Sequence, residues 1–172
     1  GSLLGVVDHT ATGAGGRLLA ARLAAPLTDV AGIGNRLDMV QALVDGTALR
    51  GKLRDALGVC PDIERPLGRL SLERGGPRDL AAIRDGLASA ASLRGLLEGD
   101  AGALTPLPEG LTGAATALGE HRVLIDRLAR ALSADLPLLT RDGNFIASGY
   151  TAVLDEQRTL RDESRRLIAA LQ

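Results

Sequence analysis

The sequence predicts an all-α protein with a multi-helix core, a long protruding C-terminal helix and one short extended segment near residues 142–148. Leucine, isoleucine, valine and alanine recur at intervals of three and four residues almost throughout, which is the repeat of helices with one buried face. Proline and glycine separate these runs and mark about six or seven helices. Phe145 and Tyr150 are the only aromatic residues, so the predicted core is aliphatic.

The glycine-rich stretch DHTATGAGGRLL, residues 8–19, raises the question of a phosphate-binding loop. A Walker loop requires lysine after its last glycine, but the chain's single lysine is Lys52, and Leu18 stands where a dinucleotide loop needs its third glycine. We therefore interpret the stretch as a helix start, capped by Thr10 or Thr12 and ended by Pro26. The expected inward side chains are Leu18, Leu19 and Leu23.

Four further helices are predicted before residue 100. They are a helix capped by Asp29 and running to Asp45, one from Thr47 to about Gly58, one from Pro61-Asp62 to about Glu73, and one from Pro77 to about Glu98. The expected inward face of the first comprises Ile33, Leu37, Val40 and Leu43 or Val44. Each boundary rests on a capping residue or on a proline or glycine break.

The second half of the chain is expected to begin with a loop over Gly99–Gly110, followed by one amphipathic helix over Leu111–Leu132. The inward residues of that helix would be Leu118, His121, Ile125, Leu128 and Leu132, with His121 a core or interface residue rather than a ligand. Asp142-Gly143 predicts a turn, Phe145-Ile146 a short extended piece, and Ser148 a cap for the last helix.

The last helix is expected to span residues 150–172 as the first part of a lever that leaves a core formed by residues 1–149. Its 23 residues correspond to a rod about 35 Å long. An apolar seam with heptad spacing follows Tyr150, Val153, Gln157, Leu160, Ser164, Leu167 and Leu171. Such a seam predicts pairing, mainly through Leu160, Leu167 and Leu171, with a helix outside this chain.

Charge gives the chain no general affinity for nucleic acid, because 20 basic and 21 acidic residues leave a net charge of -1. The last helix does carry a local arginine stripe that could contact DNA backbone. Acidic residues alternate with these arginines, so we favour an ordinary solvated face. The four arginines are Arg158, Arg161, Arg165 and Arg166.

Catalytic and metal-binding patterns are not found in the sequence. His9 and His121 are the only histidines and have no partners at metal-ligand spacing. Asp8-His9-Thr10 resembles part of a triad, but no serine lies in a nucleophile elbow, and Cys60 precedes a proline. The chain is expected to be neither an enzyme nor a cofactor-binding protein.

Location is predicted from composition and from apolar runs. A single cysteine suits a reducing compartment. No apolar run reaches membrane-spanning length, and the amino terminus lacks signal-peptide regions. We expect a cytoplasmic protein without membrane contact, in which Gly1-Ser2 is either native sequence or a tag remnant.

The segment PDIERPLGRLSLERGGPRDL concentrates charges of both signs between residues 61 and 80. Guanidinium groups and carboxylates at this density form either a hydrogen-bonded network within the core or an interdomain contact. We favour the internal network, because the required opposite charges are local. Its expected members are Asp62, Arg65, Arg69, Arg78 and Asp79.

Four ordered segments resemble the core domain of the bacterial MutS family of DNA mismatch repair proteins. They are DHTATGAGGRLLAARLAAPLTD, IGNRLDMVQALV, PDIERPLGRLSLERGGPRDL and RDGNFIASGYTAVLDEQRTL. The resemblance covers nearly the whole chain. Pro66 departs from the family pattern and makes the start of its helix uncertain by several residues.

The resemblance implies a helical core and lever from a larger parent. The family's mismatch-reading domain would lie upstream, with the clamp, the returning lever and an ATPase that binds ATP and Mg²⁺ downstream, all outside this chain. Expected partners are the parent's other domains, mismatched duplex DNA reached through the parent, and a second parent chain in a homodimer. The expected location is the bacterial cytoplasm, associated with the nucleoid through the parent.

These observations favour a structural and allosteric relay that couples ATP state to clamp position and supports mismatched-DNA binding. Two alternatives remain open. One is a helical module that grips DNA backbone through the terminal arginines. The other is a helical scaffold from a MutS-like protein that does not act in mismatch repair.

Overall fold

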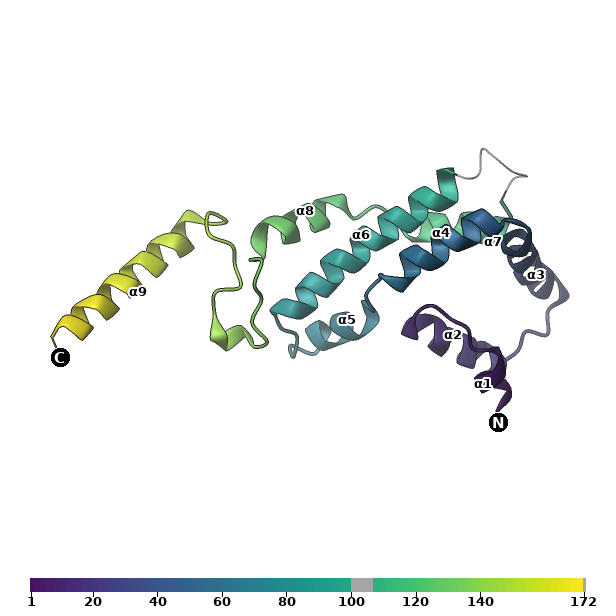
Figure 1. Ribbon diagram of the computed structural model, residues 1–172, viewed down its shortest axis with the longest axis horizontal. Coiled ribbons are helices and arrows are strands. Elements are labelled where there is room, and N and C mark those ends of the chain that lie inside the picture. Colours follow the sequence, from purple (N-terminus) through teal and green to yellow (C-terminus); the bar gives the residue numbers. More distant parts are fainter. Residues whose placement is uncertain (100–106, 172) are drawn as a thin grey trace.

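The computed structural model describes residues 1–99 and 107–171, and within these ranges it is all-α, as predicted. The helices are α1 (Leu3–Val7), α2 (Gly13–Ala24), α3 (Val30–Asp45), α4 (Thr47–Gly58), α5 (Glu64–Ser71), α6 (Pro77–Gly99), α7 (Glu109–Ala117), α8 (Arg122–Ala131) and α9 (Ala152–Ala170), with a 3-10 turn at Thr140–Asp142. Figure 1 shows an elongated molecule in which α9 projects from one end and α1–α3 lie at the other. No helix of the described part combines the length and apolarity required to cross a bilayer.

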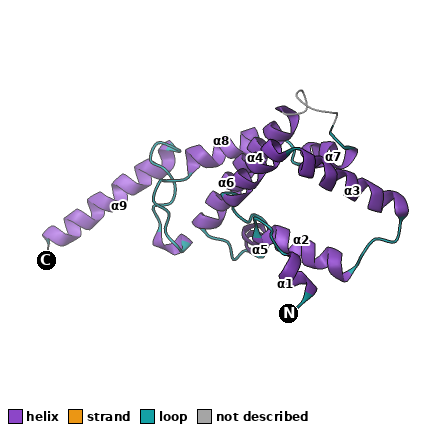
Figure 2. Ribbon diagram, turned by 45° about the vertical axis from the view of Figure 1, so that its right-hand side comes forward, coloured by secondary structure: helices purple, strands orange, loops and turns teal. Residues whose placement is uncertain are grey.

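The long helix α6 is the centre of the fold. Helices α4, α5, α7 and α8 all pack against it, while α3 packs against α4 and α7. The buried apolar side chains come mainly from this group, namely Leu49, Leu93, Leu97, Leu111, Ala115, Ala131 and Leu132. As predicted, the core is aliphatic, and Figures 1 and 2 show how far α9 stands from it.

The predicted helix starts at Thr12, Asp29 and Pro77 are confirmed. Thr12 Oγ1 accepts the Gly15 N–H at 2.9 Å, and Asp29 Oδ2 accepts the Gly32 N–H at 2.7 Å. Pro77 is the first residue of α6, where its missing N–H costs nothing. Side-chain oxygens at helix starts satisfy backbone donors that lack partners within the helix.

The predicted start of α5 at Pro61-Asp62 is wrong by two to three residues, because the helix begins at Glu64. The Asp62 side chain explains the later start, since its Oδ1 accepts the Glu64 N–H at 3.1 Å and forms a turn before the helix. The helix also ends earlier than predicted, at Ser71 rather than near Glu73. Glu73 has a φ of 56°, which no helical residue adopts.

The predicted continuous helix over Leu111–Leu132 is wrong: it is two helices, α7 and α8. Gly119 separates them with a φ of 65°, the left-handed conformation that ends helices. His121 then precedes α8 as an exposed residue instead of lying in a buried seam. The predicted Gly99–Gly110 loop falls partly outside the described residues, and α7 already begins at Glu109.

The predicted inward faces of α2 and α3 are largely exposed. In α2, Leu18 and Leu23 are exposed and Leu19 is half-buried. In α3, the apolar residues at intervals of three and four face outward, while Met39 and Leu43 are half-buried. The exposed α3 set is Val30, Ile33, Leu37, Val40 and Val44. The residues form the predicted helix with its apolar face on one side, but the described part of the chain does not cover that face.

Candidate functional site

The candidate site is the joint where α9 leaves the core. After α8, Leu132 forms an antiparallel bridge with Ile146, which confirms the predicted short extended segment. The Ser133 N–H donates to the Phe145 carbonyl at 2.9 Å, and the Ala147 N–H donates to the Ala131 carbonyl at 2.8 Å. These bonds fix the strand-like segment before α9 to the end of α8.

A carboxylate and a guanidinium connect α9 itself to this segment. Asp155 Oδ2 accepts the Gly149 N–H at 2.7 Å, and Arg158 Nη2 donates to the Ile146 carbonyl at 2.8 Å. Arg158 also pairs with Asp155 at 3.2 Å. Ser148 is not the cap that the sequence predicted, because Thr151 precedes the helix and makes no side-chain capping bond. Instead of Ser148, Asp155 stabilises the start of α9 by accepting the Gly149 N–H.

The joint is bordered by a cavity of about 490 Å³. Its lining includes Ser133, Asn144, Ser148, Asp155, Arg158 and Thr159, so its walls come from both the core side and α9. Gly143 and Asn144 have φ values of 69° and 58°, as expected of the turn predicted at Asp142-Gly143. A mainly polar joint of this kind aligns a helix without covering it.

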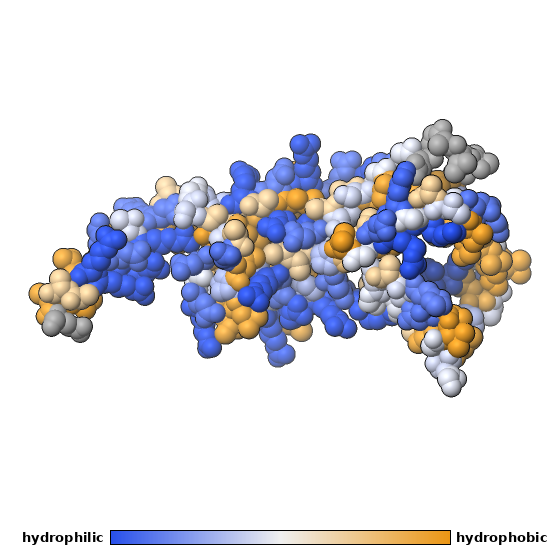
Figure 3. Space-filling view, in the orientation of Figure 1, coloured by the Kyte–Doolittle hydropathy of each residue, from blue (hydrophilic) through white to orange (hydrophobic). Residues whose placement is uncertain are grey.

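Beyond the joint, α9 carries its apolar seam on the surface. Leu160, Leu167 and Leu171 are 50%, 68% and 88% exposed, and Figure 3 shows apolar atoms gathered at the outer end of this helix. The helix begins at Ala152, two residues later than predicted. The described part of the chain supplies no partner helix for this seam.

The four terminal arginines do not form one exposed stripe as predicted. The side chain of Arg158 is only 19% exposed, because it is bound in the joint. Arg161 pairs with Asp162 at 2.8 Å and lowers the pKa of that carboxyl, while Arg165 and Arg166 are exposed. Two of the four guanidinium groups, those of Arg158 and Arg161, therefore form ion pairs with nearby carboxylates of α9.

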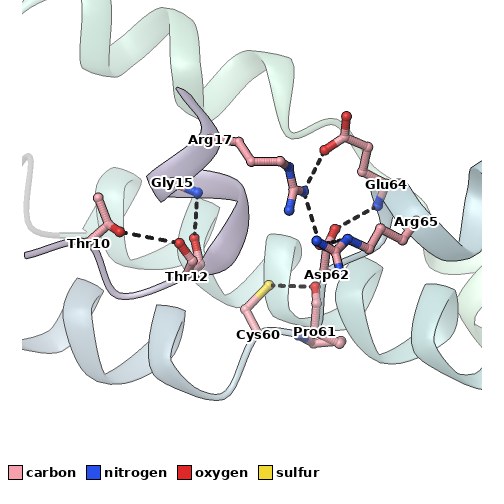
Figure 4. Close-up of polar contacts among 9 residues, drawn as sticks. All are labelled: Thr10, Thr12, Gly15, Arg17, Cys60, Pro61, Asp62, Glu64 and Arg65. Carbon is pink, nitrogen blue, oxygen red and sulfur yellow. Dashed lines mark hydrogen bonds and ion pairs between the residues drawn. The ribbon is translucent and has the colours of Figure 1, made fainter. Parts of the chain in front are cut away.

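The charged segment over residues 61–80 forms two separate clusters. In the first, Arg17 Nη2 lies 3.0 Å from Asp62 Oδ2 and 2.6 Å from Glu64 Oε2, and Arg65 Nε lies 3.7 Å from Asp62 (Figure 4). Burial opposes ionisation of Asp62, but the hydrogen bond and charge of Arg17 prevail and lower its pKa. The sequence did not predict Arg17 as a member of this cluster, because Arg17 lies 45 residues before Asp62 and no local spacing connects the two.

The second cluster joins α5 to the start of α6. Arg69 donates through Nε to Asp79 Oδ1 at 3.1 Å and also through Nη2, while Asp79 Oδ2 accepts the Gly76 N–H at 2.9 Å. Arg78 belongs to neither cluster, since its Nε donates to the Leu136 carbonyl at 3.1 Å. The predicted residues thus lie at three places instead of one.

Replacing Asp79 with asparagine should lower the free energy of unfolding at pH 7 by about 1–2 kcal/mol. The substitution removes the charge-assisted hydrogen bonds from Arg69 to the Asp79 carboxylate, whose side chain is only 14% exposed. Arg69 lowers the pKa of Asp79 more than burial raises it. The native carboxylate therefore stabilises the fold fully above its unfolded pKa of about 3.9 and less as pH falls further.

Urea unfolding of both proteins between pH 3 and pH 7 would measure this effect, and the difference should narrow below about pH 4. Asp126→Asn is the matched control, because its pair with Arg122 is long, at 3.9 Å, and exposed. That control should change stability by less than about 0.5 kcal/mol. A constant difference across the whole pH range would contradict a role for the ionised carboxylate.

The fold and the joint define a class of protein: a helical scaffold that carries a projecting arm. Within residues 1–99 and 107–171, no group of three or more histidine, cysteine or carboxylate side chains is arranged to hold a metal ion. A family model described as MutS domain III matches residues 1–172. The chain belongs to the MutS domain III family.

Similar proteins support this membership. The DNA mismatch repair protein MutS of Rhodopseudomonas palustris (strain BisB5) is 53% identical over 173 residues, covering 100% of this chain and 18% of that protein. Those of Nitrobacter winogradskyi and Roseobacter denitrificans are each 52% identical, covering 100% of this chain and 19% of theirs. The chain thus spans about a fifth of the length of these relatives.

The predicted resemblance to the MutS core domain is confirmed by this match. Because MutS domain III accounts for all 172 residues, the ATPase domain that the resemblance assigns to the parent lies outside this chain. The described residues of this chain do make contacts that hold and orient helices. The joint at Asp155 and Arg158 is such a contact, because it orients α9.

Proposed function

We propose that this chain is the core and lever of a DNA mismatch repair protein and acts as an allosteric relay. Residues 1–149 would form the core, and residues 150–172 the first part of the lever. The relay would couple ATP binding in one domain of the parent to the position of DNA-holding domains in another. The observation that carries the proposal is that α9 leaves the core through one polar joint with its apolar seam exposed.

Rigid-body motion of α9 is the mechanism that these contacts favour. A helix of 19 residues is a rod about 29 Å long, so a small rotation at its base becomes a large displacement at its tip. The Asp155 and Arg158 bonds tie the base to backbone atoms of residues 146 and 149. Movement of that segment is therefore passed directly to the helix.

Membership of the MutS domain III family supports a proposal for the partners of the relay. The other domains of the parent would supply the helix that covers Leu160, Leu167 and Leu171, and would bind ATP with Mg²⁺. The parent would bind mismatched duplex DNA in the cytoplasm, at the nucleoid, as a homodimer. In this scheme the chain contributes alignment, and no residue of it reacts with a substrate.

The relay can be tested with Arg158→Ala in the full-length parent, by measuring DNA affinity with and without ATP. We expect the factor by which ATP changes DNA affinity to fall by about tenfold, within the range of ordinary allosteric couplings. ATP hydrolysis without DNA and DNA affinity without ATP should each stay within about twofold, because Arg158 contacts neither ligand in this proposal.

Arg166→Ala is the matched control on the same helix, where the side chain is exposed. The relay predicts no change in coupling for this variant. If α9 instead grips DNA backbone, Arg166→Ala would weaken DNA binding and reduce its salt dependence by about one ion. Unchanged coupling in Arg158→Ala would refute the relay through this joint.

A further inference from the structure

Helices α1 and α2 contact each other and form an amino-terminal unit with local hydrogen bonds of its own. Ser2 Oγ accepts the Gly5 N–H at 3.2 Å, Thr12 Oγ1 accepts the Gly15 N–H at 2.9 Å, and Asp8 accepts the Thr10 hydroxyl at 2.7 Å between the two helices. The hydrogen bonds from Thr10 lower the pKa of Asp8 below its usual value, although burial opposes this shift. All three bonds lie within residues 2–15, at the two helix starts and in the linker between them.

The same unit is weakly packed on the rest of the molecule. Every residue of α1 and α2 is exposed or half-buried, and residues 25–29, which lead to α3, are all exposed. Figure 3 shows the surface hollowed between α2 and α3. Apolar burial, the main source of stability in a protein interior, contributes little to holding this unit in place.

Arginines hold the unit instead. Arg17 of α2 reaches across to Asp62 and Glu64 at the start of α5 (Figure 4), and Arg54 Nη1 of α4 donates to the His9 carbonyl at 3.1 Å. The Arg17 pair is open to solvent, since the Arg17 and Glu64 side chains are 38% and 73% exposed. Salt screens ion pairs that water reaches.

Beneath the unit lies a cavity of about 440 Å³. Thr12 and Ala14 form part of its wall from the α2 side, while Cys60, Ile63 and Leu93 line it from the core. The Cys60 thiol is half-buried there, 3.7 Å from the Pro61 carbonyl. Displacement of α2 would expose this thiol to solvent.

We propose that α1–α2 is a hinged flap over this cavity, and that the Arg17 pair with Asp62 and Glu64 is the latch that keeps it closed. The flap turns about residues 25–29 when the latch is released, and α4, α5 and α6 keep their packing. This inference concerns movement of the amino-terminal unit and does not depend on the proposed relay through α9.

The test uses the single cysteine of the chain as a reporter, with the thiol reagent DTNB. In Arg17→Gln we expect Cys60 to react about threefold faster or more, because the latch is lost. Glu64→Gln should give a smaller increase, because Asp62 still binds Arg17. Arg22→Gln, on the same helix at an exposed position, should react at the wild-type rate.

Salt and hydrogen exchange complete the test. Raising NaCl from about 0.05 to 0.5 M should accelerate wild-type labelling more than Arg17→Gln labelling, because only the wild-type protein has the Arg17 ion pairs for salt to screen. Amides of α2 should lose protection in Arg17→Gln while those of α6 keep theirs. Equal labelling of Arg17→Gln and Arg22→Gln, or loss of protection in both α2 and α6, would overturn the proposal.

Discussion

The Leu97→Ala variant is expected to lose about 2–5 kcal/mol of unfolding free energy, which urea unfolding followed by circular dichroism would measure. Leu97 is 6% exposed and lies on α6, the helix on which α4, α5, α7 and α8 all pack. Truncation removes apolar contacts and leaves a cavity that neighbouring helices fill only in part. The loss should therefore be felt by the whole core.

Leu167→Ala makes the same chemical change at a position that is 68% exposed. It should alter stability by no more than about 0.5 kcal/mol, because it removes little buried surface. A destabilisation comparable to that of Leu97→Ala would mean that the α9 seam is already covered within this chain. It would remove the main support for a seam that awaits a partner helix.

Gly86→Ala is expected to destabilise the protein by about 1–3 kcal/mol despite the better helix propensity of alanine. A β-carbon at this buried position of α6 would lie 2.0 Å from Cγ2 of Ile63. Ile63 sits just before α5, so the clash would push the start of that helix away from α6. Thermal unfolding would report the loss.

Gly95→Ala provides the control within the same helix. Its added β-carbon meets nothing within 4 Å, so it should gain up to about 1 kcal/mol from helix propensity alone. The difference between the two variants isolates the Ile63 contact. Similar effects of both substitutions would show that α5 and α6 do not pack as closely as described.

The starts of α2, α3 and α6 could be predicted because their causes are local. Thr12, Asp29 and Pro77 act on backbone groups within three residues, and their chemistry is readable from sequence. The break between α7 and α8 was missed because Gly119 lies in an otherwise continuous apolar repeat. Glycine inside a helical pattern is often tolerated, and its positive φ is a property of the folded chain.

Which helix face is buried could not be predicted from periodicity. The repeat in α3 shows that Ile33 and Leu37 share a face, but only the other helices decide whether that face is covered, and here it is not. The candidate site divides in the same way. The turn before α9 has a local signature, whereas the roles of Arg17 and Arg158 depend on carbonyls and carboxylates that folding brings to them.

The central position of α6 has a thermodynamic consequence. We expect the helices that pack directly on α6 to unfold in one cooperative transition. Helices α1, α2 and α9 contain no buried residues, so their unfolding exposes little apolar surface and should occur first. Heating should therefore melt the chain from its two ends inward, and no single midpoint would describe every residue.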